Sequence, residues 1–69
     1  MKVIDLLREC RNGTKIEIEE HLYFDDGDSS SIVFDGTVGE FGKTRYEQED
    51  ISCISLRGNA ILIIISRVQ

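Results

Sequence analysis

The chain has 69 residues and a formal charge of −5 at pH 7, from 13 acidic and 8 basic side chains. A domain this small buries only about 60% of its unfolded surface, so we expect a single domain spanning residues 1–69. The acidic excess opposes non-specific binding to nucleic-acid backbones and anionic membranes, because both attract Lys and Arg. The sequence has no apolar run near the ~20 residues that cross a bilayer and no secretory signal, so we expect a cytoplasmic protein without a membrane partner.

The first expected elements are an N-terminal helix and a long strand. Apolar side chains at positions 3, 4, 6, 7 and 10 recur at helical spacing, and the Asn12-Gly13 pair that follows favours a left-handed stop. This pattern predicts a helix over residues 2–11. From Thr14 the period changes to two, because Ile16 and Ile18 alternate with charged residues, and we expect this half-buried strand to continue to residue 24.

The middle of the chain predicts a loop and then a bent strand. Residues 25–30 are all turn-forming and solvating types, which favours a loop. Residues 31–41 again have strand character, and Gly36 and Gly39 within them predict a bulge or a sharp bend. Residues 44–46 are a candidate for a further short strand.

The last third predicts a hairpin. Residues 51–56 and 60–65 are apolar strands joined by the tight turn Arg57-Gly58-Asn59. The fold class we expect is mostly β, with an N-terminal helix followed by a five-stranded antiparallel, strongly bent small barrel of Sm-like or SH3-like type. Curling into a partly closed barrel reduces the exposed edges of such a sheet.

The final strand is apolar on both faces. An antiparallel sheet with one solvated face should alternate apolar and polar residues, and residues 60–65 do not. The helix, the opposite barrel wall or another chain must cover the second face. We therefore predict a subunit interface at Ile61, Ile63 and Ile65, with a homo-oligomer as the expected state.

Two segments carry a resemblance to a known family. Residues 54–63 read Ile-Ser-Leu-Arg-Gly-Asn-Ala-Ile-Leu-Ile, and residues 36–41 read Gly-Thr-Val-Gly-Glu-Phe. They resemble the second and first motifs of the Sm-like family, which includes the bacterial Hfq proteins. The resemblance implies a small barrel and a ring in which neighbouring subunits pair their last two strands.

The resemblance does not extend to the family's base-binding positions. After the aromatic residue the family has an acidic residue and then an asparagine, whereas Gly42 and Lys43 follow Phe41 here. The resemblance therefore does not carry RNA binding to this chain. A plain hairpin turn with an exposed arginine is the favoured interpretation of residues 57–59, because fold-level analogy does not fix function.

The sequence favours neither a metal site nor a catalytic site. Asp25, Asp26 and Asp28 surround Gly27, but the spacing of a calcium-binding loop is absent, so we interpret them as a solvated turn. The single histidine, His21, is expected to be structural. Cys10 and Cys53 occupy apolar positions and are expected to pack in the core. We predict no cofactor and no enzymatic activity, because no known catalytic motif organises the serines and carboxylates.

The function predicted from the sequence is a non-catalytic binding or assembly module that self-associates through its C-terminal strand. A homo-oligomer is the expected state, and a protein partner is the second possibility. The alternative is an RNA-binding or single-stranded nucleic-acid-binding Sm-like protein. Its basic and aromatic patch would consist of Lys43, Arg45, Tyr46 and Arg57, together with the turn residues Gly58 and Asn59.

Overall fold

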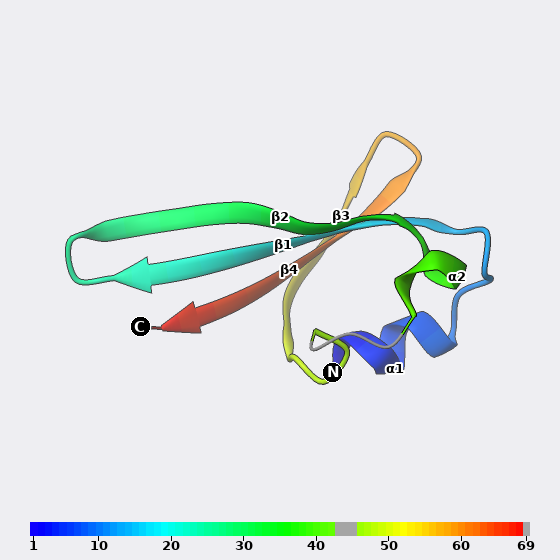
Figure 1. Cartoon of the computed structure of the whole chain (residues 1–69), viewed down its shortest axis with the longest axis horizontal. Helices are drawn as coiled ribbons and strands as arrows, with labels where there is room; N and C mark the ends of the chain where they lie inside the picture. The colour runs from blue at the N-terminus through cyan, green and yellow to red at the C-terminus, as the bar shows by residue number, and fades with distance from the viewer. Residues whose placement is uncertain (43–45, 69) are drawn as a thin grey trace.

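The structure is a computed structural model, and it describes residues 1–42 and 46–68 (Figure 1). Its elements are, in chain order, α1 (Val3–Arg8), β1 (Lys15–Phe24), β2 (Gly27–Thr37), α2 (Val38–Phe41), β3 (Ile51–Arg57) and β4 (Ala60–Val68). The described residues thus form a mostly β chain with a short N-terminal helix, which confirms that part of the prediction. Neither helix has the length and apolar character that a membrane crossing needs.

The four strands of the described residues form one mixed sheet in the order β2-β1-β4-β3. β1 pairs antiparallel with β2, β3 pairs antiparallel with β4, and the central pair of β1 and β4 is parallel. The predicted five-stranded barrel is not formed, because this sheet is open and ends in two edge strands, β2 and β3. The candidate strand at residues 44–46 falls largely outside the described residues.

The stretch predicted as one bent strand, residues 31–41, divides at Thr37. The Thr37 hydroxyl oxygen accepts a hydrogen bond from the Glu40 N–H at 3.3 Å, and the Glu40 carboxylate accepts one from the Thr37 N–H at 3.0 Å. This reciprocal capping box begins α2 and so ends β2. Gly39 lies inside α2, where its N–H donates to the Asn12 carbonyl at 2.9 Å. A Cβ on Gly39 would lie 3.2 Å from the Asn12 Cβ, which explains the glycine by close approach and not by a bend in a strand.

The bulges of the sheet lie away from the glycines that were expected to mark them. In the pairing of β1 with β2, Ile18 is opposite Phe34 and Glu19 is opposite Ile32, so Val33 is the extra residue. A second bulge is at Ser52, between Ile51 and Cys53 of β3. The predicted loop at residues 25–30 is also shorter, because β2 already begins at Gly27 and pairs back with the end of β1.

The helix α1 is shorter than the predicted range of residues 2–11. Its first amides are satisfied by the chain itself: the Val3 N–H donates to the Glu49 carbonyl and the Ile4 N–H to the Glu47 carbonyl, both at 2.9 Å. The Lys2 N–H donates to the Asp5 carboxylate at 3.1 Å. Beyond Arg8 the chain turns toward α2, where the Gly39 and Val38 N–H groups donate to the carbonyls of Asn12 and Thr14, both at 2.9 Å.

The hydrophobic core lies between the helices and one face of the central strands. Ile16 and Ile18 of β1 pair with Ile61 and Ile63 of β4, and this face packs against α1 and α2. The buried core residues are Val3, Leu7, Ile16, Ile18, Phe41, Ile63 and Ile65. The rings of Phe34 and Phe41 meet edge to face, with centroids 5.0 Å apart. Leu7 is buried and Leu6 packs against the core, so the apolar stripe of α1 faces the sheet.

Candidate functional site

The edge strand β3 is the most exposed apolar element of the described chain. All its residues from Ser52 to Arg57 are exposed, and the side chains of Ile54 and Leu56 have 48% and 76% of their surface accessible. Both point to the same face as the core, because Ile54 pairs with Ile63 and Leu56 with Ile61. In Figure 1 the hairpin of β3 and β4 leads away from α1, so the helix does not cover this end of the sheet.

The N-terminus pairs with the beginning of strand β3. Lys2 forms an antiparallel bridge with Asp50, and the Ile51 N–H donates to the Met1 carbonyl at 2.9 Å. Among the described residues, no backbone hydrogen bond from outside the sheet reaches β3 beyond Ile51. The segment Ser52–Arg57 therefore has one side paired with β4 and the other side open, and we call this segment the β3 edge.

The turn between β3 and β4 is the two-residue loop of Gly58 and Asn59. Gly58 has φ = 60°, whereas no described residue other than glycine has a positive φ. A tight turn with glycine in the left-handed region at its first central position suits the twist of a hairpin. This confirms the predicted hairpin and its tight turn.

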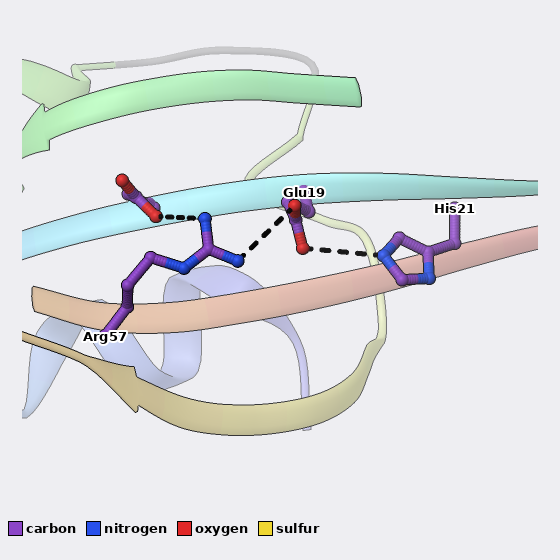
Figure 2. A network of polar contacts seen from close by, with 4 residues as sticks. Glu19, His21 and Arg57 are labelled. Atoms are coloured by element: carbon purple, nitrogen blue, oxygen red, sulfur yellow. Dashed lines mark hydrogen bonds and ion pairs between the residues drawn. The ribbon is translucent and has the colours of Figure 1, made fainter. Parts of the chain in front are cut away.

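Arg57, at the end of β3, forms a polar network on the sheet face opposite the core (Figure 2). Its Nη1 atom lies 3.1 Å from Glu17 Oε2, and its Nη2 atom lies 3.7 Å from Glu19 Oε1. Glu19 also lies 3.5 Å from His21, measured from Oε2 to Nε2. The guanidinium group thus connects the edge strand to β1 across β4.

This network lies on the second apolar face of β4, beside Leu62. Leu62 lies between Glu17 of β1 and Ser55 of β3 in the strand register, and no helix packs on that face. Leu62 is nevertheless only 7% exposed. Arginine covers apolar surface with its methylene stem while its charged head is solvated or paired. The Arg57 side chain crosses β4 on this face to reach Glu17 and Glu19, so its stem is in position to cover Leu62.

The residues predicted as a subunit interface have different surroundings from those expected. β4 is a central strand paired on both sides, not an edge. Ile63 is 0% and Ile65 is 1% exposed, so both lie in the core of the single chain and offer no contact surface. Ile61 is half-buried next to Leu56 and borders the β3 edge.

The predicted nucleic-acid patch is not assembled by its described residues. Lys43 and Arg45 lie outside the described part of the chain. Tyr46 packs against the core beside α1, whereas Arg57 lies at the far end of β3 and is paired with Glu17 and Glu19. Gly58 and Asn59 form an exposed turn beside Arg57.

Cys10 is half-buried and Cys53 is exposed on β3, so the prediction that both pack in the core fails for Cys53. No group of three or more His, Cys, Asp or Glu side chains within residues 1–42 and 46–68 is arranged to hold a metal ion. The same residues enclose no pocket. Comparison of the chain with protein-family models, with curated proteins and with solved structures gives no match.

Proposed function

We propose that the chain is a binding and assembly module, not an enzyme, and that its binding element is the β3 edge. The observation that carries the proposal is an open strand edge whose side chains are apolar and exposed, at Ile54 and Leu56. An unpaired strand edge offers a row of N–H and C=O groups to a further strand, and alternate side chains then add specificity.

The β3 edge has the properties that strand addition requires. From Cys53 to Arg57 its pairing with β4 is uninterrupted, so the backbone has a regular repeat that a new strand can follow. Its composition is neutral up to Arg57, and the positive charge of Arg57 is already paired with two glutamates. A strand that adds here loses little solvation of charged groups.

The nucleic-acid alternative has weaker support. Binding to a single strand relies on cationic and aromatic side chains that lie together along a groove. Of the described members of the predicted patch, Tyr46 precedes β3 and packs against the core, whereas Arg57 is the last residue of β3. No described contact favours this alternative over strand addition.

Selection of peptides tests the proposal. The full chain, without an N-terminal extension and at low surface density, is presented with a displayed library of peptides of about seven residues, a length that spans the β3 edge. We expect enrichment of alternating apolar sequences. Binding of the enriched peptides should fall at least tenfold for Leu56→Lys, because the added charge disfavours strand pairing at an edge.

The matched control is Ile32→Lys, on the other edge strand, since Ile32 is 52% exposed and also apolar. This variant should bind the enriched peptides like the wild type. If no peptide is enriched, or if both lysine variants lose binding equally, the β3 edge is not the binding element.

A further inference from the structure

We propose that the occupant of the β3 edge is a second copy of this chain, with the two β3 strands antiparallel around a two-fold axis at Ser55. The pairing would join the two four-stranded sheets into one continuous sheet. This inference rests on the proposed function, because it takes the β3 edge as the binding element and then names the strand that binds there.

The N-terminus and the bulge at Ser52 fix the register. In a symmetric antiparallel pair, the residues opposite each other are equally far from the axis. With Ser55 on the axis, the overlap runs from Cys53 to Arg57, which is the regular part of β3. With Ile54 on the axis, Arg57 of one copy would be opposite Ile51 of the other, whose N–H is already bonded to Met1.

The backbone alternation supports the same register. Arg57 and Ala60 flank the two-residue hairpin loop, so their backbone N–H and C=O groups point toward each other. Along β3, the backbone groups of successive residues then point alternately toward β4 and away from it. The outward groups of the β3 edge therefore belong to Leu56 and Ile54. With Ser55 on the axis, Leu56 of each copy is opposite Ile54 of the other, and these two pairs exchange the hydrogen bonds.

The side chains of this register are self-complementary. Ile54 and Leu56 point to the same face, so the two copies bring four exposed apolar side chains together. In each copy, this cluster of four side chains is continuous with the half-buried Ile61. Burial of cross-strand apolar pairs is the main source of sheet stabilisation. The predicted interface residue Ile61 would then border the dimer contact from within its own sheet.

The charge distribution permits the pairing. The two Arg57 side chains lie at opposite ends of the overlap, and each is paired with Glu17 and Glu19 of its own chain. The net charge of −5 on each copy still opposes association at long range. Salt screens such repulsion over roughly 10 Å at 0.1 M, so the dimer should strengthen as salt rises from 0.02 to ~0.2 M.

Sedimentation equilibrium of the full chain, without an N-terminal extension, tests the occupant. We expect a dimer at concentrations of about 100 μM, near the lower limit for an interface of modest size. Leu56→Lys should be a monomer at every concentration, whereas Ile32→Lys should associate like the wild type. A wild-type monomer at ~100 μM, or a dimer that Leu56→Lys leaves intact, overturns the inference.

A blocking extension gives an independent variant. The bridge between Lys2 and Asp50 is antiparallel, so residues added before Met1 would continue alongside Ser52 and the rest of the β3 edge. An extension of alternating threonine and valine should therefore pair with β3 within the same chain and abolish the dimer. A Gly-Ser extension of equal length is the control, because it has low strand propensity. If the dimer persists with the threonine-valine extension, β3 is not the contact.

Disulfide trapping tests the register. Residues opposite each other without hydrogen bonds have Cα atoms about 4.5 Å apart, within the range that a disulfide spans. Ser55→Cys in a chain with Cys10→Ser and Cys53→Ser should form a covalent dimer in mild oxidant. Cys10→Ser alone keeps Cys53, whose two copies would lie four residues apart along the strand, and should stay uncrosslinked. Equal trapping by Cys53 overturns the Ser55 register.

The outcomes separate this inference from the proposed function. If library peptides bind the β3 edge and the chain is monomeric, the proposed function stands and the second copy is not the occupant. If the chain is monomeric and no peptide binds, both proposals fail. A dimer that requires Leu56 supports both.

Discussion

The two edge strands of the sheet differ in how they are protected. β2 has its bulge near the middle, at Val33, and carries Asp28 and Asp35, so a strand added there would meet an interrupted ladder and two charges. β3 has its bulge at Ser52, near its beginning, and the five residues that follow are regular. Apart from the terminal Arg57, these residues are uncharged.

Soluble proteins protect sheet edges because an exposed strand pairs with other chains. Bulges and inward or edge charges are common means of protection, and here the chain uses both on β2. The unprotected length of β3 is short, since the N-terminus covers its beginning and the hairpin turn ends it. The difference indicates that protection is available to this fold and is absent where we propose that binding occurs.

The largest expected effect is a difference in stability loss between a core substitution on β4 and an edge substitution on β3. Ile63 and Ile54 are directly paired, yet Ile63 is fully buried and Ile54 is about half exposed. Ile63→Ala should reduce the free energy of unfolding by about 2–5 kcal/mol, because it leaves a cavity in the core. Ile54→Ala should cost about 1 kcal/mol or less, because part of its surface is already in water.

Urea unfolding measures both changes. The measurement belongs in the Leu56→Lys background, where dimer formation does not add to the apparent stability. Equal losses for the two variants would show that β3 is covered in the single chain and has no free edge.

The local signals of the sequence predict most of the elements. The alternation from residue 15 to 24, the hairpin around Gly58 and the apolar stripe of the N-terminal helix all appear in the structure. These features depend on interactions within a few residues, so the spacing of apolar residues and the residue types of the turns predict them directly. The T-x-x-E sequence from Thr37 to Glu40 also marks a helix start, and it would have divided the predicted bent strand.

Strand order depends on contacts that no local pattern records. A doubly apolar strand is typical of a central strand in a parallel pair, and residues 60–65 satisfy this description. The predicted interface at Ile61, Ile63 and Ile65 assumes antiparallel neighbours on β4 and one uncovered face, whereas the structure places this face in the core. The ion pair beside the buried Leu62 joins Arg57 and Glu17, which are 40 positions apart in the sequence. That pairing follows only from the strand order.

Gly58→Val tests whether the turn holds the regular part of β3 in place. The φ of 60° at Gly58 is strained for any β-branched residue. We expect a loss of about 1–3 kcal/mol in unfolding free energy and weaker dimer formation, because the end of the β3 edge would move. Gly13→Val is the control, since a Cβ there has open space around it and φ is not in the left-handed region. An unchanged midpoint for Gly58→Val would place the turn elsewhere.

Deletion of Val33 tests the protection of β2. The deletion removes the extra residue and makes the pairing of β1 with β2 continuous. It should cost about 1 kcal/mol, because Val33 is half-buried against the core. In the Leu56→Lys background, which blocks β3, we expect association to return through the straightened β2 edge. Sedimentation equilibrium gives the result, and a folded monomer would show that the charges of β2, and not its bulge, provide the protection.

The smallest expected effect concerns Arg57, which connects the β3 edge to β1. Ion pairs with a half-exposed arginine contribute little, and Arg57 is 51% exposed. Arg57→Gln should reduce the free energy of unfolding by about 1 kcal/mol or less at low salt, because Glu17 and Glu19 would be left close together without a cation. The loss should shrink in 1 M NaCl, where the Debye length is about 3 Å.

Lys2→Gln is the matched control for this change, because Lys2 pairs with the highly exposed Asp50 at 3.8 Å and a smaller effect is expected there.

Arg57→Gln also tests whether the arginine contributes to the dimer. If Arg57 only anchors β3 to its own sheet, Arg57→Gln leaves the Ser55→Cys trapping unchanged wherever the chain is folded. If the arginine also neutralises its face of the joined sheet, trapping falls at low salt and recovers as salt is added, because the unpaired glutamates of the two copies would then repel each other along that face.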